Sequence, residues 1–140
     1  MRVKAIMQTK VLHISPYATL MEAAEKLLVN RIDTLLVLKG DKLLGINGLR
    51  DLFTAPIPAH YGNPMTRHDN GQQLLSIWKT MTIQDLMNEK VVTVRDEASL
   101  LRAAQLMDKS RKYSLPVLRD GEVVGVVSYS DIARALVGKA

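Results

Sequence analysis

The sequence predicts an α+β fold made of two β-α-β-β-α repeats that pack sheet to sheet with pseudo-two-fold symmetry. Three observations support this prediction: a repeat with an offset of 80 residues, helical apolar spacing in each copy, and an Asp-Gly turn between apolar runs. Residues 3–52 align with residues 83–132 without a gap and share 13 identities in 50 positions. A repeat at a fixed period decides the architecture before any single motif does. Because two copies are too few for a solenoid, we expect a closed pair with a cleft between its halves.

Each copy opens with a short apolar strand, at residues 11–14 and 91–94. In the first copy, apolar residues then recur from Leu20 onward at the spacing of one helix face. Thr19 and Glu22 form a capping-box start for that helix, and Ser99 stands at the same point of the second copy. The sequence therefore predicts a helix after each first strand.

Two further strands follow in each copy, joined by a tight turn. In the second copy, residues 115–118 and 123–127 flank the pair Asp120-Gly121, which is a strong hairpin signal. The first copy repeats this over residues 35–46, and a closing helix is expected at 49–53 and again at 130–137.

The repeat also predicts the domain boundaries. Repeat 1 covers residues 1–53 and repeat 2 covers residues 83–140, with a linker at 54–82. Three prolines and a glycine within residues 54–64 indicate irregular chain. A short helix is predicted in the linker at residues 74–78.

Composition limits the class of protein. The chain has 140 residues, of which 47% are hydrophobic and 4% aromatic, so the core is expected to be aliphatic. It has no cysteine, which excludes disulfides and thiolate metal sites, and no apolar run of about 18 residues. We expect a soluble, cytoplasmic protein. A net charge of +5 favours anionic partners, although an ordinary basic surface explains it equally well.

Several segments together resemble a known module, the CBS domain, which is named after cystathionine β-synthase. They are Met87, the strand at 91–94, the alanine-faced helix, Leu115-Pro116-Val117 and the run from Gly125 to Asp131. The first copy, with its run from Gly45 to Asp51, resembles a second CBS domain, and the pair resembles a Bateman module over almost the whole chain. The insert before the second copy is similar to the linker of stand-alone acetoin-utilisation-type CBS proteins.

The resemblance implies a regulatory module that senses an adenosine nucleotide in the cleft between the repeats. The family motif is G-h-h-[ST]-x-x-D, in which the carboxylate holds the ribose. In this chain it runs from Gly125 to Asp131, with Ser128 at the [ST] position and Asp131 at the last position. A carboxylate suits this task because it can accept hydrogen bonds from two vicinal hydroxyls. The alternative is that Asp131 only caps the last helix.

The resemblance also suggests which residues contact the rest of the nucleotide. Adenine would lie against Val92, Thr93 and Pro116, residues that are equally suited to a core. The stretch just before the second strand of repeat 2, with Tyr113, would meet the phosphates. The phosphate candidates are Arg111, Lys112 and Ser114, with Arg31 from repeat 1, and a solvated charge is the alternative for Arg31 and Lys112.

Repeat 1 departs from the motif. Gly48 replaces the serine, while Asp51 is retained as a candidate ribose residue. Asp33 stands where a carboxylate would repel phosphate. We therefore expect the first site to be weak, empty or fitted to a less charged ligand. The alternative role for Asp51 is then that of a helix residue only.

No catalytic residue and no metal site is predicted, and the protein is not expected to be an enzyme. His60 and His68 lie eight residues apart in the linker and lack a third clear ligand. AMP, ADP or ATP is the expected ligand, ahead of S-adenosylmethionine and NAD, and the expected partners are a second copy and a regulated protein. Two rival functions remain: a basic nucleic-acid-binding protein, and a dimerisation module whose sites have decayed.

Overall fold

The computed structural model describes residues 1–54 and 72–139, which form two compact units. The repeat-1 unit contains Leu12–Gly40 and Leu44–Lys90. The repeat-2 unit contains Met1–Val11, Asp41–Leu43 and Val91–Ala140. Both units mix helices and strands, which confirms the predicted α+β class.

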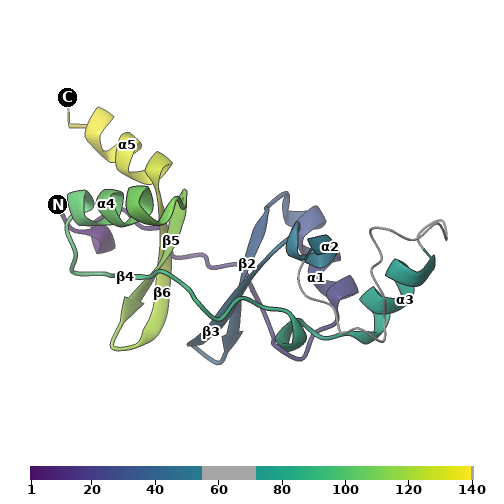
Figure 1. The fold of residues 1–140 in the computed structure, drawn as a ribbon. Coiled ribbons are helices and arrows are strands. Elements are labelled where there is room, and N and C mark those ends of the chain that lie inside the picture. Colours follow the sequence, from purple (N-terminus) through teal and green to yellow (C-terminus); the bar gives the residue numbers. More distant parts are fainter. Residues whose placement is uncertain (55–71, 140) are drawn as a thin grey trace. The chain divides into compact units, whose positions relative to one another are not determined.

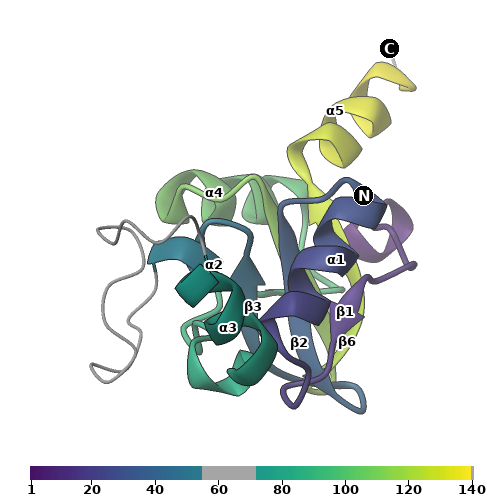
Figure 2. The same cartoon turned by 90° about the vertical axis from the view of Figure 1, so that its right-hand side faces the viewer.

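The repeat-1 unit places its helices beside a three-stranded arrangement in the order β1-β2-β3 (Figures 1 and 2). Strand β1 runs parallel to β2, with His13 opposite Leu36. Its elements are β1 (His13–Ile14), α1 (Leu20–Asn30), β2 (Thr34–Lys39), β3 (Lys42–Gly48), α2 (Asp51–Thr54), α3 (Gln72–Thr80) and the 3-10 helix η3 (Ile83–Asp85).

The repeat-2 unit repeats this plan. Strand β4 runs parallel to β5, and β5 pairs antiparallel with β6, with Leu115 opposite Val127. Helix α4 lies beside β5 in Figure 1. Its elements are the 3-10 helix η1 (Val3–Ala5), β4 (Val94–Arg95), α4 (Leu100–Ser110), β5 (Ser114–Arg119), β6 (Glu122–Ser128) and α5 (Tyr129–Val137).

The predicted helix starts and the second hairpin are present. The Thr19 hydroxyl accepts from the Glu22 amide at 3.1 Å, and the Ser99 hydroxyl accepts from the Arg102 amide at the same distance. Asp120 and Gly121 have φ angles of 51° and 81°, a left-handed pair that tight hairpin turns require. The local sequence thus sets these boundaries.

Other boundaries differ from the prediction. The first strand of each copy is only two residues long, with β1 at His13–Ile14 and β4 at Val94–Arg95. The linker helix is longer than expected and spans Gln72–Thr80. The sequence did not predict the two 3-10 helices, since three residues give no measurable periodicity.

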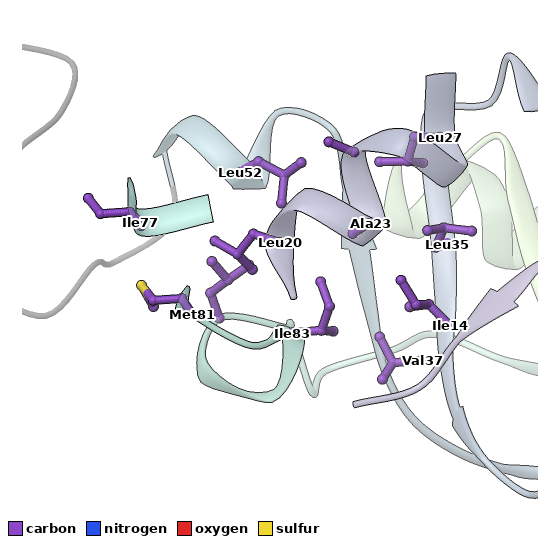
Figure 3. Close-up of a cluster of buried hydrophobic side chains, with 12 residues drawn as sticks. Ile14, Leu20, Ala23, Leu27, Leu35, Val37, Leu52, Ile77, Met81 and Ile83 are labelled. Atoms are coloured by element: carbon purple, nitrogen blue, oxygen red, sulfur yellow. The ribbon is translucent and has the colours of Figure 1, made fainter. Parts of the chain in front are cut away.

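Each unit has its own apolar core. In the repeat-1 unit, Leu20, Leu27 and Leu35 cluster with Ile77 of α3 and Ile83 of η3, which are both buried (Figure 3). In the repeat-2 unit, buried residues from α4, β5, β6 and α5 surround Val3 from the N-terminus. Both cores therefore need a segment that precedes the other repeat in the sequence.

Equivalent hydrogen bonds hold these two segments. The Val3 amide donates to Ala98 O in the repeat-2 unit, and the Ile83 amide donates to Ala18 O in the repeat-1 unit, both at 2.9 Å. Val3 and Ile83 are equivalent under the 80-residue offset, as are Ala18 and Ala98. The two copies have thus exchanged their N-terminal segments.

Candidate functional site

The end of β6 and the start of α5 bring Ser128 and Asp131 together. The Ser128 hydroxyl accepts from the Asp131 amide at 3.2 Å, and Asp131 Oδ2 accepts from the Ser128 amide at 2.9 Å. This reciprocal pair is a capping box, and the Ser128 hydroxyl also donates to Oδ2 at 3.0 Å. The two motif residues therefore form one hydrogen-bonded group at the first turn of the helix.

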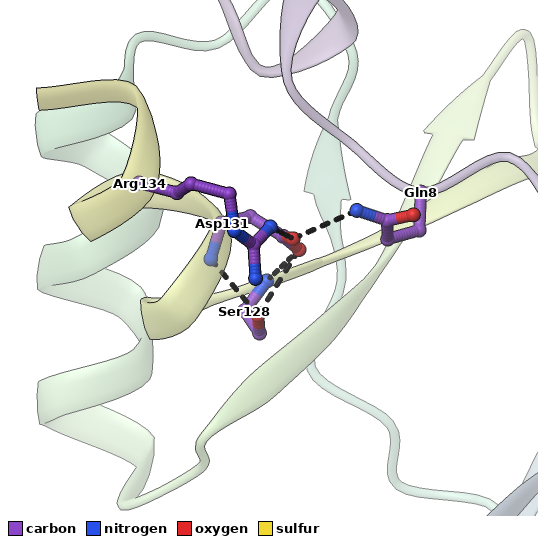
Figure 4. Close-up of polar contacts among 4 residues, drawn as sticks. All are labelled: Gln8, Ser128, Asp131 and Arg134. Carbon is purple, nitrogen blue, oxygen red and sulfur yellow. Dashed lines mark hydrogen bonds and ion pairs between the residues drawn. The ribbon is translucent and has the colours of Figure 1, made fainter. Parts of the chain in front are cut away.

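The second carboxylate oxygen of Asp131 binds two other side chains (Figure 4). Gln8 Nε2 donates to Oδ1 at 3.0 Å, and Arg134 Nη1 donates to it at 3.2 Å. Asp131 is only 5% exposed, whereas the Arg134 side chain is 69% exposed and Gln8 is also exposed. The buried carboxylate of Asp131 is thus covered by the exposed side chains of Gln8 and Arg134, and a ligand can reach it when these side chains move.

Asp131 is held in its charged form. Burial raises its pKa, but hydrogen bonds from Gln8, Ser128 and Arg134 together outweigh burial and keep the pKa below its ordinary value. The group is therefore ionised at neutral pH. An ionised carboxylate is the stronger acceptor for hydroxyl donors.

Two of the other predicted residues lie next to this group. Ser114 pairs with Ser128 across β5 and β6. Tyr113 O accepts from the Tyr129 amide at 3.2 Å, and the two tyrosine rings meet edge to face with their centroids 6.4 Å apart. Tyr113 and Ser114 are both exposed beside the motif.

The remaining candidates of repeat 2 have structural positions of their own. Pro116 is buried in β5, Val92 packs against the core, and Thr93 is half-buried. Arg111 caps the end of α4 with a left-handed φ of 56°, and the amide of Lys112 donates to Met107 O at 2.9 Å. Arg111 and Lys112 are exposed, so their side chains remain available to an anion.

The equivalent position in repeat 1 keeps the backbone part of the motif. The Gly48 amide donates to Asp51 Oδ2 at 2.8 Å, and the Leu49 amide donates to Asp33 O at 2.9 Å. A pocket of about 490 Å³ lies here, lined by Asp33, Thr34, Gly48, Leu49, Arg50 and Phe53. Arg31 caps α1 with a φ of 53°, as Arg111 caps α4.

Sequence reasoning missed Gln8 and Arg134. Arg134 is one helical turn after Asp131, so its spacing was a usable signal. Gln8 precedes Asp131 by 123 residues, and only the exchange of N-terminal segments explains why they meet.

Metal-ligand clusters and membrane-spanning helices were also considered for the described residues. Within residues 1–54 and 72–139, no group of three His, Cys, Asp or Glu side chains could hold a metal ion, and no helix is long and apolar enough to cross a membrane. His60 and His68 lie outside the described residues.

The chain has similarity to curated proteins over parts of its length. It is 41% identical over 61 residues to the mitochondrial CBS domain-containing protein CBSX3 of Arabidopsis thaliana, covering 42% of this chain and 30% of that protein. It is 30% identical over 137 residues to a CBS domain-containing protein of Dictyostelium discoideum, covering 96% and 90%. The chain spans less than a third of the first relatives it matches, including 18% of a homoserine O-acetyltransferase from Methanococcoides burtonii.

Solved structures show the same fold. CBSX2 from Arabidopsis thaliana has a TM-score of 0.80 at 24% identity, covering 99% of this chain and 95% of that one. An acetoin utilization protein, AcuB, from Vibrio cholerae has a TM-score of 0.76 at 22% identity, covering 99% and 92%. The CBS domain pair of protein MJ0100, solved with 5′-methylthioadenosine and S-adenosyl-L-methionine, has a TM-score of 0.68 at 25% identity, covering 97% and 99%.

A family model confirms what the repeat and the motif order indicated. The model for the CBS domain matches twice, at residues 3–57 and 83–138, which together make up most of the chain. The chain therefore belongs to the CBS domain family and contains two CBS domains.

Proposed function

We propose that this protein is a regulatory module that binds an adenosine-containing ligand at Ser128 and Asp131 of repeat 2. The observation that carries the proposal is the Ser128–Asp131 group, a charged carboxylate beside a hydroxyl at the start of α5. Vicinal ribose hydroxyls would donate to Asp131. The MJ0100 domain pair supports the ligand class, because its structure contains two adenosine derivatives.

The other candidate residues are proposed to contact the remaining parts of the ligand. Adenine would lie against Pro116, Val92 and Thr93. A phosphate would meet Ser114, Arg111 and Lys112, with Tyr113 beside them. The exposed positions of Arg111, Lys112 and Ser114 support this assignment, because anions can reach them from solvent.

The site fits the ribose only after a local change. A carboxylate offers about four acceptor positions. In Asp131, two are taken by the amide and hydroxyl of Ser128, and two by Gln8 and Arg134. Ribose must therefore displace at least one of these donors.

A second, weaker site is proposed in repeat 1. Its pocket of about 490 Å³ supports binding, while the carboxylate of Asp33 in the lining disfavours phosphate. Gly48 supplies no hydroxyl, and a Cβ there would lie 3.3 Å from Asp51 Oδ2. A nucleoside with few phosphates or a positive charge suits this pocket best, with Asp51, which accepts from the Gly48 amide of the lining, as the candidate ribose residue.

The ligand is proposed to act by changing the balance between two states of the protein, which a regulated partner distinguishes. We further propose a cytoplasmic homodimer without enzymatic activity. Leu101, Leu136 and Val137 support self-association, since they are 68%, 59% and 75% exposed on α4 and α5. Sedimentation of the pure protein would give the oligomeric state.

A thermal-shift panel tests the proposed ligand class. AMP, ADP, ATP, NAD, S-adenosylmethionine and 5′-methylthioadenosine would each be added at millimolar concentration. A ligand present at about 100 times its Kd adds roughly 2.7 kcal/mol to stability. Asp131→Ala should abolish the shift and Asp51→Ala should barely change it. The absence of any shift would reject the proposal, and salt-dependent binding to DNA or RNA in its place would favour the nucleic-acid alternative.

A further inference from the structure

Gln8 is the one described donor to Asp131 that does not come from the motif or its helix. Its carboxamide crosses from the N-terminal segment to Oδ1, with Nε2 at 3.0 Å (Figure 4). Oδ2 is held by Ser128 within the helix cap, and breaking that pair would free the first turn of α5. Oδ1 is therefore the oxygen at which an incoming hydroxyl can replace a donor without disturbing the helix.

The backbone around Gln8 is fixed even though its side chain is exposed. Its amide donates to Val126 O at 2.8 Å, and the Val126 amide donates to Gln8 O at 2.9 Å. Gly125 lies against the same segment, because a Cβ on it would be 2.7 Å from Gln8 O. The carboxamide is thus presented to Asp131 by a rigid backbone, while rotation of its own side chain can withdraw it.

Repeat 1 provides an internal comparison. Asn88 is equivalent to Gln8, and it makes the same two backbone hydrogen bonds, with Ile46, at 2.9 Å each. Its side chain is one methylene shorter, and its Oδ1 accepts from the Lys90 amide at 3.0 Å. The carboxylate of Asp51 is bound by the Gly48 amide. An amide in this place therefore reaches the carboxylate in repeat 2, whereas in repeat 1 it binds its own backbone.

We infer that Gln8 is a specificity-determining residue that competes with the ribose hydroxyls for Oδ1 of Asp131. The inference rests on the proposed ribose-binding role of that carboxylate. Bound Gln8 lowers the apparent affinity, because only the fraction of molecules with the carboxamide withdrawn can accept the diol. Arg134 can also release Oδ1, but its guanidinium can then pair with a phosphate of the ligand. Removing Arg134 would therefore not give the same clear gain in affinity.

Calorimetric titration with 5′-AMP and 2′-deoxy-AMP tests this competition. The proteins compared are the wild type, Gln8→Ala, Gln8→Asn and Asn88→Ala. Gln8→Ala should tighten AMP binding by about 3- to 10-fold, the effect of one net hydrogen bond. Gln8→Asn, which installs the repeat-1 residue, should do the same. The gain should be smaller for 2′-deoxy-AMP, which has one hydroxyl fewer for Asp131, and Asn88→Ala should leave both affinities unchanged.

The outcomes separate the inference from the proposed function. If the wild type binds AMP and Gln8→Ala binds it equally or more weakly, the inference is wrong while the proposed function stands. An equal gain with AMP and 2′-deoxy-AMP also overturns the inference, since Gln8 would then not compete with the diol. If neither protein binds AMP, ribose binding at Asp131 is rejected together with the inference. Equal melting temperatures of Gln8→Ala and Asn88→Ala would show that folding does not explain the difference.

Discussion

Asn47 has a side chain that is completely buried and makes no hydrogen bond through either its oxygen or its nitrogen. Its equivalent in repeat 2 is Val127, a buried core residue. An unsatisfied buried polar group costs about 1–3 kcal/mol. We therefore expect Asn47→Val to raise the free energy of unfolding by about 1–3 kcal/mol, measured by urea denaturation.

The reciprocal change is the control for this prediction. Val127→Asn should destabilise the protein by a similar amount or more, because it places an amide in the apolar core of repeat 2. A loss of stability in Asn47→Val would contradict the prediction and would indicate a bound water or another partner for the amide.

Asp131 should make stability depend on pH. Its pKa is lower in the folded protein than its ordinary value, so the unfolded chain binds the proton more readily. The resulting stabilisation is fully present above the ordinary pKa and is lost as the pH falls through the folded pKa. Asp131→Asn should therefore destabilise the protein near pH 6 and lose this effect towards pH 2, as followed by urea denaturation at several pH values. A difference between the two proteins that stays constant over this range would contradict the assignment.

The sequence revealed only part of the candidate site. Ser128 and Asp131 are three residues apart along the chain, so the motif was enough to bring them together. In the proposed function, the donors on Oδ1 control the access of ribose to the carboxylate. One of them, Gln8, reaches Asp131 only through the tertiary structure. The two readings of Asp131, ribose residue and helix cap, are also compatible, because the cap uses Oδ2 and the proposed ligand uses Oδ1.

Gly125 in β6 and Gly45 in β3 lie so close to a neighbouring segment of the chain that a side chain would not fit. A Cβ on Gly125 would lie 2.7 Å from Gln8 O and 2.8 Å from Met7 Sδ, and a Cβ on Gly45 would lie 2.9 Å from Asn88 O. Backbone oxygens in a strand bridge cannot easily move. Gly125→Ala should therefore reduce the free energy of unfolding by about 1–3 kcal/mol in a urea melt.

Gly138→Ala is the matched control for this effect. Its nearest atom is 3.4 Å from the new Cβ, and its φ of −66° suits any residue. It should be neutral or slightly stabilising, by less than about 1 kcal/mol. Equal losses of stability in the two variants would mean that close approach does not explain why glycine is kept in both copies.

Arg111 separates a structural role from a proposed functional one. A non-glycine residue in the left-handed conformation costs about 1 kcal/mol, so Arg111→Gly should stabilise the end of α4 by roughly that amount. The same variant should weaken AMP binding if the guanidinium meets phosphate. Arg31→Gly, at the equivalent cap of α1, should stabilise the protein with less effect on AMP. Thermal melts and calorimetry distinguish the two effects, and unchanged AMP affinity in Arg111→Gly would remove it from the phosphate site.

At the level of elements, the sequence was most informative where chemistry is local. The caps at Thr19 and Ser99 and the turn at Asp120-Gly121 depend on residues within three positions of each other, and each lies where it was predicted. The short strands β1 and β4 were predicted too long, because apolar residues such as Val92 pack on the core without joining the sheet. Apolar sequence alone does not distinguish these two states.

At the level of the whole molecule, the compact units and the sequence repeats have different boundaries. An 80-residue offset aligns residues 3–52 with 83–132 whichever repeat each N-terminal segment packs against. The exchange therefore leaves no mark on the alignment. It appears only in the structure, where Val3 completes the core that contains Leu115, and Ile83 completes the core that contains Leu35.

This exchange predicts which fragment can fold alone. The repeat-1 core includes Ile77, Met81, Ile83 and Leu86 from the segment 72–90, and all four are buried. Fully burying such side chains is worth about 1.5–3 kcal/mol each, a total comparable with the stability of a small domain. A fragment of residues 12–90 should therefore unfold cooperatively, with dispersed amide signals in NMR. The fragment 1–57, which follows the first sequence repeat, should lack both features even though it contains all of β1, α1, β2 and β3. Adding residues 72–90 as a separate peptide should restore structure to residues 12–57, and independent folding of 1–57 would show that the exchanged segment is dispensable.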